Sequence, residues 1–375
     1  MKSAAPKVAV GLGSLVLGLL GAEVALRVSG YDPRAEALNG RVQLVRSSPA
    51  PGRGYELVPG ASGTGWGTRV HVNSHGFRGP EVELVAPGRT RIVALGDSVT
   101  FGNDLAYAET WPAALERELR RAGQSVDVLD LGLGGYDTTQ EVATLEALGL
   151  AFQPAHVILG YCVNDVGIVS MSMETPFVEA DAANPLYASR IAQWLHVRVI
   201  ERNQTRALFE HNREETYARA FEAEIDPLDE RLAPGLTELR VAVEGAPAAD
   251  QDLATRRIPP RWYASEHRLG RLQHAFTRLA ALAAEHGFAV TVLLIPYLEE
   301  DPLIERGLEL VRELAETRGF QVVEAHERFL AGGLEKLRIR ATDPVHPNAR
   351  GHALLAEALA EAFRSTLEPD SREAD

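Results

Sequence analysis

The sequence contains a single cysteine, Cys162, and fewer basic than acidic residues. One cysteine excludes an intrachain disulfide and a cysteine-based zinc site. The 52 acidic residues outnumber the 38 lysines and arginines, so the formal net charge is −14. Because nucleic-acid binding depends on clustered basic side chains that neutralise phosphates, we expect no nucleic-acid partner. The 375 residues, 45% of them hydrophobic, do suffice for a large folded core.

The N-terminus carries an apolar run that indicates export. Lys2 and Lys7 precede residues 8–22, which are all apolar or small, and Glu23 separates this run from three further apolar residues. Residues 8–22 suit a secretory signal, and extension to residue 26 approaches the roughly 20 residues that cross a bilayer. We expect residues 1–29 to be an uncleaved signal anchor that contacts the membrane through residues 8–26.

Two alternatives remain open for this N-terminal segment. It could be a cleaved signal, in which case the protein is secreted, or a buried helix of a cytoplasmic protein. If the segment is an uncleaved anchor or a cleaved signal, the basic N-terminus stays inside, and the catalytic domain lies outside the cytoplasm, on the periplasmic or extracellular face.

Residues 30–89 are rich in glycine, proline and serine and predict a small β-rich extension. Alternation of polar and apolar side chains over residues 68–73, followed by a glycine-containing turn at residues 74–79, predicts a strand and a hairpin. His71 and His75 could be read as a metal pair, but two surface histidines explain this spacing better.

From residue 90 the chain alternates between short apolar strands and helices. Five strands are predicted, at residues 92–95, 126–131, 155–161, 288–295 and 321–323. Alternating units with apolar strands are typical of a parallel sheet covered by helices on both faces. Over residues 90–367 we therefore expect an α/β fold, a three-layer αβα sandwich around a flavodoxin-like, mainly parallel five-stranded sheet. Ligands of such sheets bind beyond the carboxyl ends of the strands.

Helix boundaries and the remaining segments are predicted from local signals. Thr138 and Glu141 have the spacing of a capping box, and Asn348 is a plausible N-cap for the last helix. Residues 166–267 are too long for a plain loop and predict a helical insertion or lid. Residues 368–375 predict a disordered acidic tail.

Chemistry-bearing side chains follow the predicted strands. The segment GDSVTFG, residues 96–102, follows the first strand, and Asp343 and His346 come just before the last helix. A serine hydroxyl is a poor nucleophile at neutral pH, so acyl transfer needs an imidazole to take its proton and an acid to hold that imidazole. Ser98, His346 and Asp343 could supply these three groups.

Two further strand ends offer hydrogen-bond donors for an oxyanion. Gly132, Gly134 and Gly135 follow the second strand, and Asn164 follows the third. Backbone N–H groups and an amide side chain that converge on one point can stabilise the tetrahedral intermediate of acyl transfer.

These residues, in this order, resemble the SGNH, or GDSL, hydrolase superfamily of esterases and lipases. Residues 96–102 match its first block, Gly-Asp-Ser-x-Thr-x-Gly, and Asp343 and His346 match the Asp-x-x-His of its last block. The resemblance implies that Ser98 is the nucleophile, that its backbone N–H is one oxyanion donor, that His346 is the general base and that Asp343 orients His346.

The resemblance covers roughly residues 90–165 and 270–365. It implies the Gly135 N–H as the second oxyanion donor and the Asn164 side chain as the third. Cys162 stands where the family's third block has glycine. This difference affects the local backbone conformation but not the ability of the Asn164 side-chain amide to donate a hydrogen bond.

The apolar N-terminus, the extension and the hydrolase blocks together look like membrane-associated bacterial members of this superfamily. The extension carries Asn-Ser-His-Gly-Phe-Arg-Gly at residues 73–79. This likeness implies a location more than a reaction.

Other kinds of site fit the residues less well. A phosphate-binding loop at residues 131–138 fails because Asp137 stands at the third glycine position of G-x-G-x-x-G, and Thr100 breaks the G-x-S-x-G elbow. His352, a possible partner of His346 in a metal site, lies inside the last helix. Cys162 has no base near it in sequence, so it is a poor nucleophile. We expect no cofactor and no metal.

Together these observations predict a serine esterase that hydrolyses acyl or acetyl esters of small molecules, lipids or acylated carbohydrates. An O-acyltransferase of envelope polymers would use the same residues and differ only in its acceptor. A catalytically silent glycan- or lipid-binding module would keep the fold, but the complete set of blocks argues against it.

Overall fold

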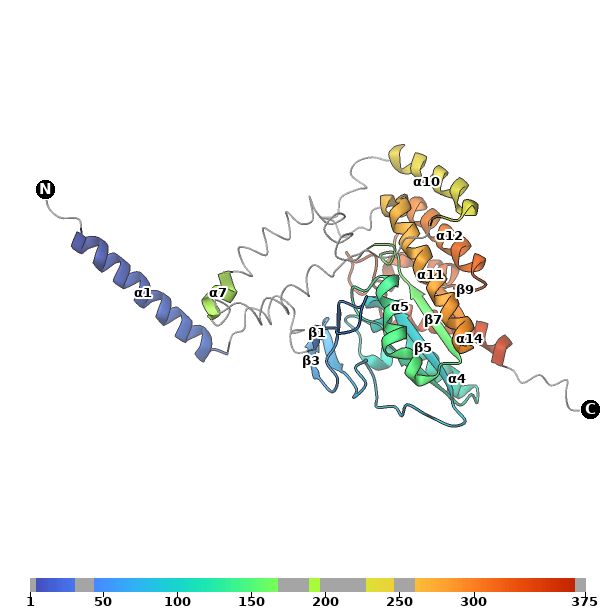
Figure 1. The fold of residues 1–375 in the computed structure, drawn as a ribbon, viewed down its shortest axis with the longest axis horizontal. Helices are drawn as coiled ribbons and strands as arrows, with labels where there is room; N and C mark the ends of the chain where they lie inside the picture. The colour runs from blue at the N-terminus through green and yellow to red at the C-terminus, as the bar shows by residue number, and fades with distance from the viewer. Residues whose placement is uncertain (1–4, 31–43, 168–188, 196–226, 246–259, 368–375) are drawn as a thin grey trace, which may run out of the picture.

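A five-stranded, fully parallel sheet forms the centre of the computed structural model, which describes residues 5–30, 44–167, 189–195, 227–245 and 260–367 (Figure 1). Its strand order is β6-β5-β7-β8-β9. The strands are β5 (Thr90–Gly96), β6 (Val126–Asp130), β7 (His156–Tyr161), β8 (Ala289–Leu294) and β9 (Gln321–Glu324). All five lie where the alternating pattern predicts them, so the predicted α/β fold with a parallel five-stranded sheet is confirmed.

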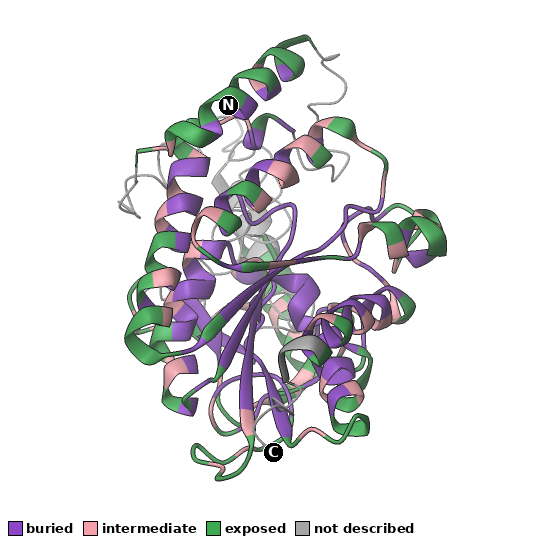
Figure 2. Cartoon of the chain, turned by 90° about the vertical axis from the view of Figure 1, so that its right-hand side faces the viewer, coloured by how far each residue is buried: buried purple, intermediate pink, exposed green. Residues whose placement is uncertain are grey.

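Helices cover both faces of the buried sheet (Figure 2). α4 (Trp111–Arg121) packs against α14 (Ala349–Leu367), and α11 (Glu266–His286) packs against α5 (Thr138–Ala147) and α12 (Pro302–Thr317). Because both faces of the sheet are covered, the central strands are largely apolar; every residue of β6 and β7 is buried, including Asp127 and Asp130 of β6.

The N-terminal extension forms two small antiparallel hairpins. β1 (Val45–Ser47) pairs with β2 (Tyr55–Leu57), and β3 (Ser62–Gly65) pairs with β4 (Thr68–His71). The predicted β-rich character is therefore confirmed.

The turn predicted at residues 74–79 is present, and it closes a single antiparallel bridge between Val72 and Arg78. The longer pairing of β4 is with the strand before it, through the two-residue turn Trp66–Gly67, which the sequence did not predict. Trp66 and Gly67 both have positive φ, 49° and 74°, as the tight turn favoured by twisted hairpins requires. Within the turn at residues 74–77, Asn73 Oδ1 accepts hydrogen bonds from the N–H groups of His75 and Phe77.

The capping box of α5 lies one residue earlier than predicted. Asp137 Oδ1 accepts a hydrogen bond from Gln140 N at 3.1 Å, and Gln140 Oε1 accepts one from Asp137 N at 3.2 Å. Asp is a better N-cap than Thr, so Asp137 takes the position predicted for Thr138. Asn348 caps α14 as predicted, since its Oδ1 accepts hydrogen bonds from Arg350 N and Gly351 N.

The N-terminal apolar segment forms α1 (Ala5–Val28). The side chain of Glu23, near its end, accepts hydrogen bonds from Ser189 Oγ, Arg190 N and Ile191 N at the start of α7 (Arg190–Leu195). Within the described residues, no helix is at once long and apolar enough to span a bilayer. The expected transmembrane helix over residues 8–26 is therefore not supported.

Only parts of the predicted insertion at 166–267 belong to the described residues. They are helical, comprising α7, α10 (Ala233–Gly245) and a short 3₁₀ turn at Pro260–Trp262. The acidic tail, residues 368–375, lies outside the described residues.

Gly160 of β7 provides a direct test of how closely the layers pack. A Cβ at this position would lie 2.6 Å from Thr100 Oγ1 and 3.2 Å from the Trp111 ring. We expect Gly160→Ala to lower the free energy of unfolding by about 1–3 kcal/mol because the added methyl overpacks the core. Gly245→Ala, whose Cβ meets nothing within 4 Å, is the matched control. Equal urea midpoints for the two variants would contradict this packing.

Candidate active site

The segment around Ser98 forms a sharp turn from a strand into a short helix. Gly96 ends β5 with φ of 152°, and a Cβ there would overlap Thr100. Ser98 is the first residue of the four-residue helix α3 (Ser98–Phe101), and Gly102 ends this helix in the left-handed conformation. The turn therefore needs glycine at both ends and presents Ser98, 8% exposed, beyond the carboxyl end of β5.

Ser98, His346 and Asp343 form a continuous hydrogen-bonded chain. Ser98 Oγ lies 2.8 Å from His346 Nε2, and His346 Nδ1 lies 2.9 Å from Asp343 Oδ2. Asp343 Oδ1 also accepts hydrogen bonds from the N–H groups of Val345 and His346, which folds the loop before α14 around the carboxylate. The structure thus brings together three residues that sequence analysis paired across 248 positions.

The charges of Asp343 and His346 stabilise each other within the hydrogen-bonded chain. Burial alone would raise the pKa of Asp343, but the hydrogen bond and charge of His346, together with two backbone N–H groups, lower that pKa to about 2. Burial opposes a charged His346, yet the hydrogen bond and charge of Asp343 outweigh it and raise the pKa of His346. An ionised Asp343 accepts a hydrogen bond from Nδ1–H, which leaves Nε2 of a neutral His346 as an acceptor facing Ser98.

Asp97 is a site residue to which sequence analysis gave no role. Its Oδ1 accepts a hydrogen bond from Val99 N at 2.8 Å and so caps α3. Its Oδ2 accepts one from Asn164 Nδ2 at 2.9 Å and lies 3.0 Å from Ser98 Oγ. Asp is a preferred N-cap residue, so the sequence carried a signal for the capping contact, although no helix was predicted at residue 98. The contact with Asn164 joins distant segments and has no local signal.

The candidate oxyanion donors lie on neighbouring loops. Asn164 reaches the Ser98 turn through its hydrogen bond to Asp97. The loop that carries Gly135 is joined to the same turn because Leu133 N donates to Gly96 O at 3.0 Å. Gly135 has φ of 90°, a conformation that favours glycine. The structure therefore places both loops beside Ser98.

Cys162 replaces the usual glycine without backbone strain. The described non-glycine residues with positive φ are Trp66, Asp104 and Gln153, and Cys162 is not among them. Its side chain is buried, and burial raises the pKa of its thiol well above the usual value. Cys162 is therefore a packed core residue in a conformation that any residue can adopt, and a thiol kept neutral is a poor nucleophile.

Two buried carboxyl groups, those of Glu141 and Asp165, lie close to Asp97. Burial raises the pKa values of both well above the usual range, followed by repulsion from Asp97 for Glu141 and from Glu141 for Asp165. Asp165 Oδ2 accepts a hydrogen bond from Cys162 N at 2.6 Å. Because burial favours their neutral forms, these groups add little negative charge beside Asp97.

The histidines considered for metal binding have other partners. His352 Nδ1 accepts a hydrogen bond from Trp111 N, and burial lowers the pKa of His352 to about 3. His71 lies against Ser62 and His75 against the Val82 carbonyl, so the two rings serve different contacts. In the part of the chain that the structure describes, no three His, Cys, Asp or Glu side chains form a group that could hold a metal ion.

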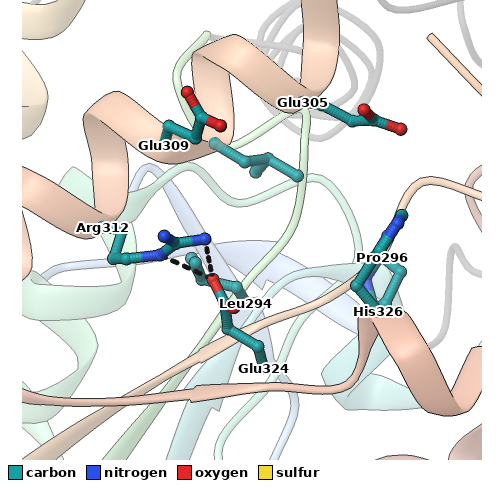
Figure 3. Close-up of a pocket in the computed structure, with 8 residues that line it drawn as sticks. Leu294, Pro296, Glu305, Glu309, Arg312, Glu324 and His326 are labelled. Atoms are coloured by element: carbon teal, nitrogen blue, oxygen red, sulfur yellow. Dashed lines mark hydrogen bonds and ion pairs between the residues drawn. The ribbon is translucent and has the colours of Figure 1, made fainter. Parts of the chain in front are cut away.

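A separate cavity of about 170 Å³ opens at the carboxyl ends of β8 and β9, under α12 (Figure 3). Arg312 and Glu324 form an ion pair in its wall. Neither Ser98, Asp343 nor His346 lines it. It is therefore distinct from the hydrogen-bonded chain described above.

A model of the GDSL-like Lipase/Acylhydrolase family matches residues 94–354. No curated protein sequence matches this chain significantly. Solved structures similar to it include LAE5, an alpha/beta hydrolase enzyme from the metagenome of Lake Arreo, Spain, which is 17% identical with a TM-score of 0.42 over 76% of this chain and 99% of its own. A lipase/acylhydrolase from Enterococcus faecalis is 14% identical with a TM-score of 0.40, over 75% of this chain and 98% of its own.

A third similar structure, the acetyl xylan esterase AlAXEase, is 14% identical with a TM-score of 0.39 over 72% of this chain and 98% of its own. At such low TM-scores the assignment rests on the sequence match alone. That match spans well over half of the chain and contains Ser98, Asn164, Asp343 and His346. The chain therefore belongs to the GDSL-like lipase/acylhydrolase family and is an ester-hydrolysing enzyme.

Proposed function

We propose that this enzyme is a serine esterase in which Ser98 is the nucleophile, His346 the general base and Asp343 the residue that orients His346. Its substrates are acyl or acetyl esters of small molecules, lipids or carbohydrates. The observation that carries the proposal is the hydrogen-bonded chain from Ser98 Oγ through His346 to Asp343, with distances of 2.8 and 2.9 Å. A serine hydroxyl becomes an effective nucleophile when a positioned base takes its proton.

The reaction has two steps. In the first, Ser98 Oγ attacks the ester carbonyl carbon while His346 Nε2 takes the hydroxyl proton; the alcohol then leaves with that proton and an acyl-enzyme remains. In the second, His346 takes a proton from water, the resulting hydroxide attacks the acyl carbon, and Ser98 recovers its proton as the acid departs. Asp343 stays ionised throughout and stabilises the charged imidazole, in keeping with its low pKa.

Three donors would hold the oxyanion in both steps. Ser98 is the first residue of α3, so its backbone N–H has no intrahelical acceptor. The Gly135 N–H is the second donor. Asn164 donates one of its two amide N–H groups to Asp97, which holds the amide in one orientation and leaves the other N–H for the oxyanion.

Replacing the nucleophile tests the assignment. We expect Ser98→Ala to lower hydrolysis of short p-nitrophenyl esters by on the order of 10³-fold or more and to abolish labelling by a fluorophosphonate, because no other group can take over the attack. Ser125→Ala, an exposed serine at the opposite end of the sheet, is the control. Undiminished turnover in Ser98→Ala would refute the mechanism.

The pH dependence tests the roles of His346 and Asp343. The base must be neutral, so kcat/KM should fall as the pH drops through the raised pKa of His346. Asp343→Asn removes the hydrogen bond and charge that raise this pKa, so the acidic limb should move to lower pH. The plateau should also drop by about 10⁴-fold. An unshifted limb would show that Asp343 does not act on His346.

We also propose that the catalytic domain lies outside the cytoplasm. The support is the sequence alone, with Lys2 and Lys7 before the apolar residues 8–22. After expression in a bacterium, the full chain should appear in the membrane or exported fraction, whereas a chain that starts at residue 31 should stay in the cytosol. Recovery of the full chain in the cytosol would contradict export.

A further inference from the structure

We propose that the N-terminal extension, residues 44–80, is a working part of the catalytic centre: its β3–β4 turn and Arg78 hold residues 101–105, which follow Ser98, in the catalytic geometry. This inference rests on the proposed function. The family match begins at residue 94, so the extension lies outside the conserved hydrolase unit that the match defines.

The β3–β4 turn presses on Asp104. Asp104 N donates a hydrogen bond to Trp66 O at 2.7 Å, and a Cβ on Gly67 would overlap the Asp104 carboxylate. The Trp66 ring packs against Phe101, with ring centroids 4.7 Å apart. Asp104 itself has φ of 63°, a rare conformation for a non-glycine residue, so it depends on its surroundings to stay in place.

Asp104 also contacts the loop that carries Asp343 and His346. Its Oδ1 accepts a hydrogen bond from Arg340 Nη2 at 2.5 Å, as part of an ion pair. Arg340 O in turn accepts a hydrogen bond from Asp343 N at 2.9 Å. The turn of the extension is thus connected through three successive contacts to Asp343, the residue that orients His346.

Arg78 also holds residues 101–105. Its guanidinium donates hydrogen bonds to three carbonyls, those of Phe101, of Gly102 at 3.0 Å and of Leu105 at 2.6 Å, and it stacks on the Phe101 ring. Arg78 is only 1% exposed. A buried guanidinium that satisfies successive carbonyls fixes the end of α3 in a way that a single-point ammonium cannot reproduce.

The extension also contacts the loop of Gly135. Tyr55 OH donates to Gly134 O at 2.6 Å, and Tyr136 OH donates back to Tyr55 O. Phe101, Leu133 and Tyr136 belong to one buried apolar cluster with residues of the extension. The loop of Gly135 and the helix that begins at Ser98 therefore both pack against the extension.

Two glycines of the extension form a matched pair for the test. Gly67 and Gly60 are both exposed and both have φ of 74°, so alanine strains the backbone similarly at each. A Cβ at Gly67 would push on Asp104, whereas a Cβ at Gly60 meets nothing within 4 Å. Gly67→Ala should displace the segment after Ser98, and Gly60→Ala should not.

The readout is turnover per competent site, counted by active-site titration with a fluorophosphonate. We expect Gly67→Ala to lower kcat per titrated site by about 10- to 100-fold with little change in KM, because small misplacements of reacting groups cost this much. A purely structural role would lower the number of titrated sites and the melting temperature, but not the turnover of each site. Equal turnover per site in the two variants would overturn the proposal.

A second pair of variants examines Arg78. Arg78→Lys keeps the charge but cannot bond three carbonyls, and should also lower kcat per site; Arg69→Lys, on the exposed face of β4, should not. Unchanged turnover per site in Arg78→Lys would show that Arg78 does not position the segment. If this variant does not fold, the glycine pair decides.

The wild-type protein tests the proposed function separately. Failure of the fluorophosphonate to label Ser98 refutes the serine mechanism. Normal labelling, together with equal turnover per site in Gly67→Ala and Gly60→Ala, refutes the positioning role alone.

Discussion

The site is built on the close approach of α3 to the sheet, which requires glycine at or near the carboxyl ends of three neighbouring strands. Thr100, two residues after Ser98, would collide with a Cβ at Gly96, the last residue of β5, at Gly132, two residues after β6, or at Gly160 in β7. These strands are adjacent in the order β6-β5-β7. Without Cβ atoms there, the helix can settle on the edge of the sheet, and Ser98 comes within reach of His346.

Asp97 organises the polar part of the same region. One of its oxygens caps α3, and the other lies between Asn164 and Ser98. Because the Ser98 hydroxyl has a single proton, it can donate to Asp97 or to His346 but not to both. With His346 neutral, Nε2 can accept this proton; with His346 charged, Nε2 becomes a donor and Asp97 remains the acceptor. The protonation state of His346 therefore also sets the orientation of the nucleophile.

Sequence analysis predicted the features that are encoded locally. The apolar strands, the glycines around Ser98 and the order of Ser98, Asn164, Asp343 and His346 follow from short segments, and the parallel fold brings their ends together. Local signals also missed one pairing and misplaced one cap: the alternation over residues 68–73 did not show that residues 62–65 pair with it, and the N-cap of α5 is Asp137 and not Thr138. The roles of Arg78, Asp104 and Arg340 depend on contacts between distant segments, which no periodicity or spacing reports.

The buried cluster that joins the extension to Phe101, Leu133 and Tyr136 also determines where this protein can be divided. A fragment cut at the boundary of the family match would begin inside β5 and expose these aromatic and aliphatic side chains to water. Such a fragment would contain the hydrolase blocks and, beside them, an exposed apolar surface prone to aggregation. We therefore expect the smallest stably folded part of this enzyme to include the first hairpin and so to be longer than the segment that the family model matches.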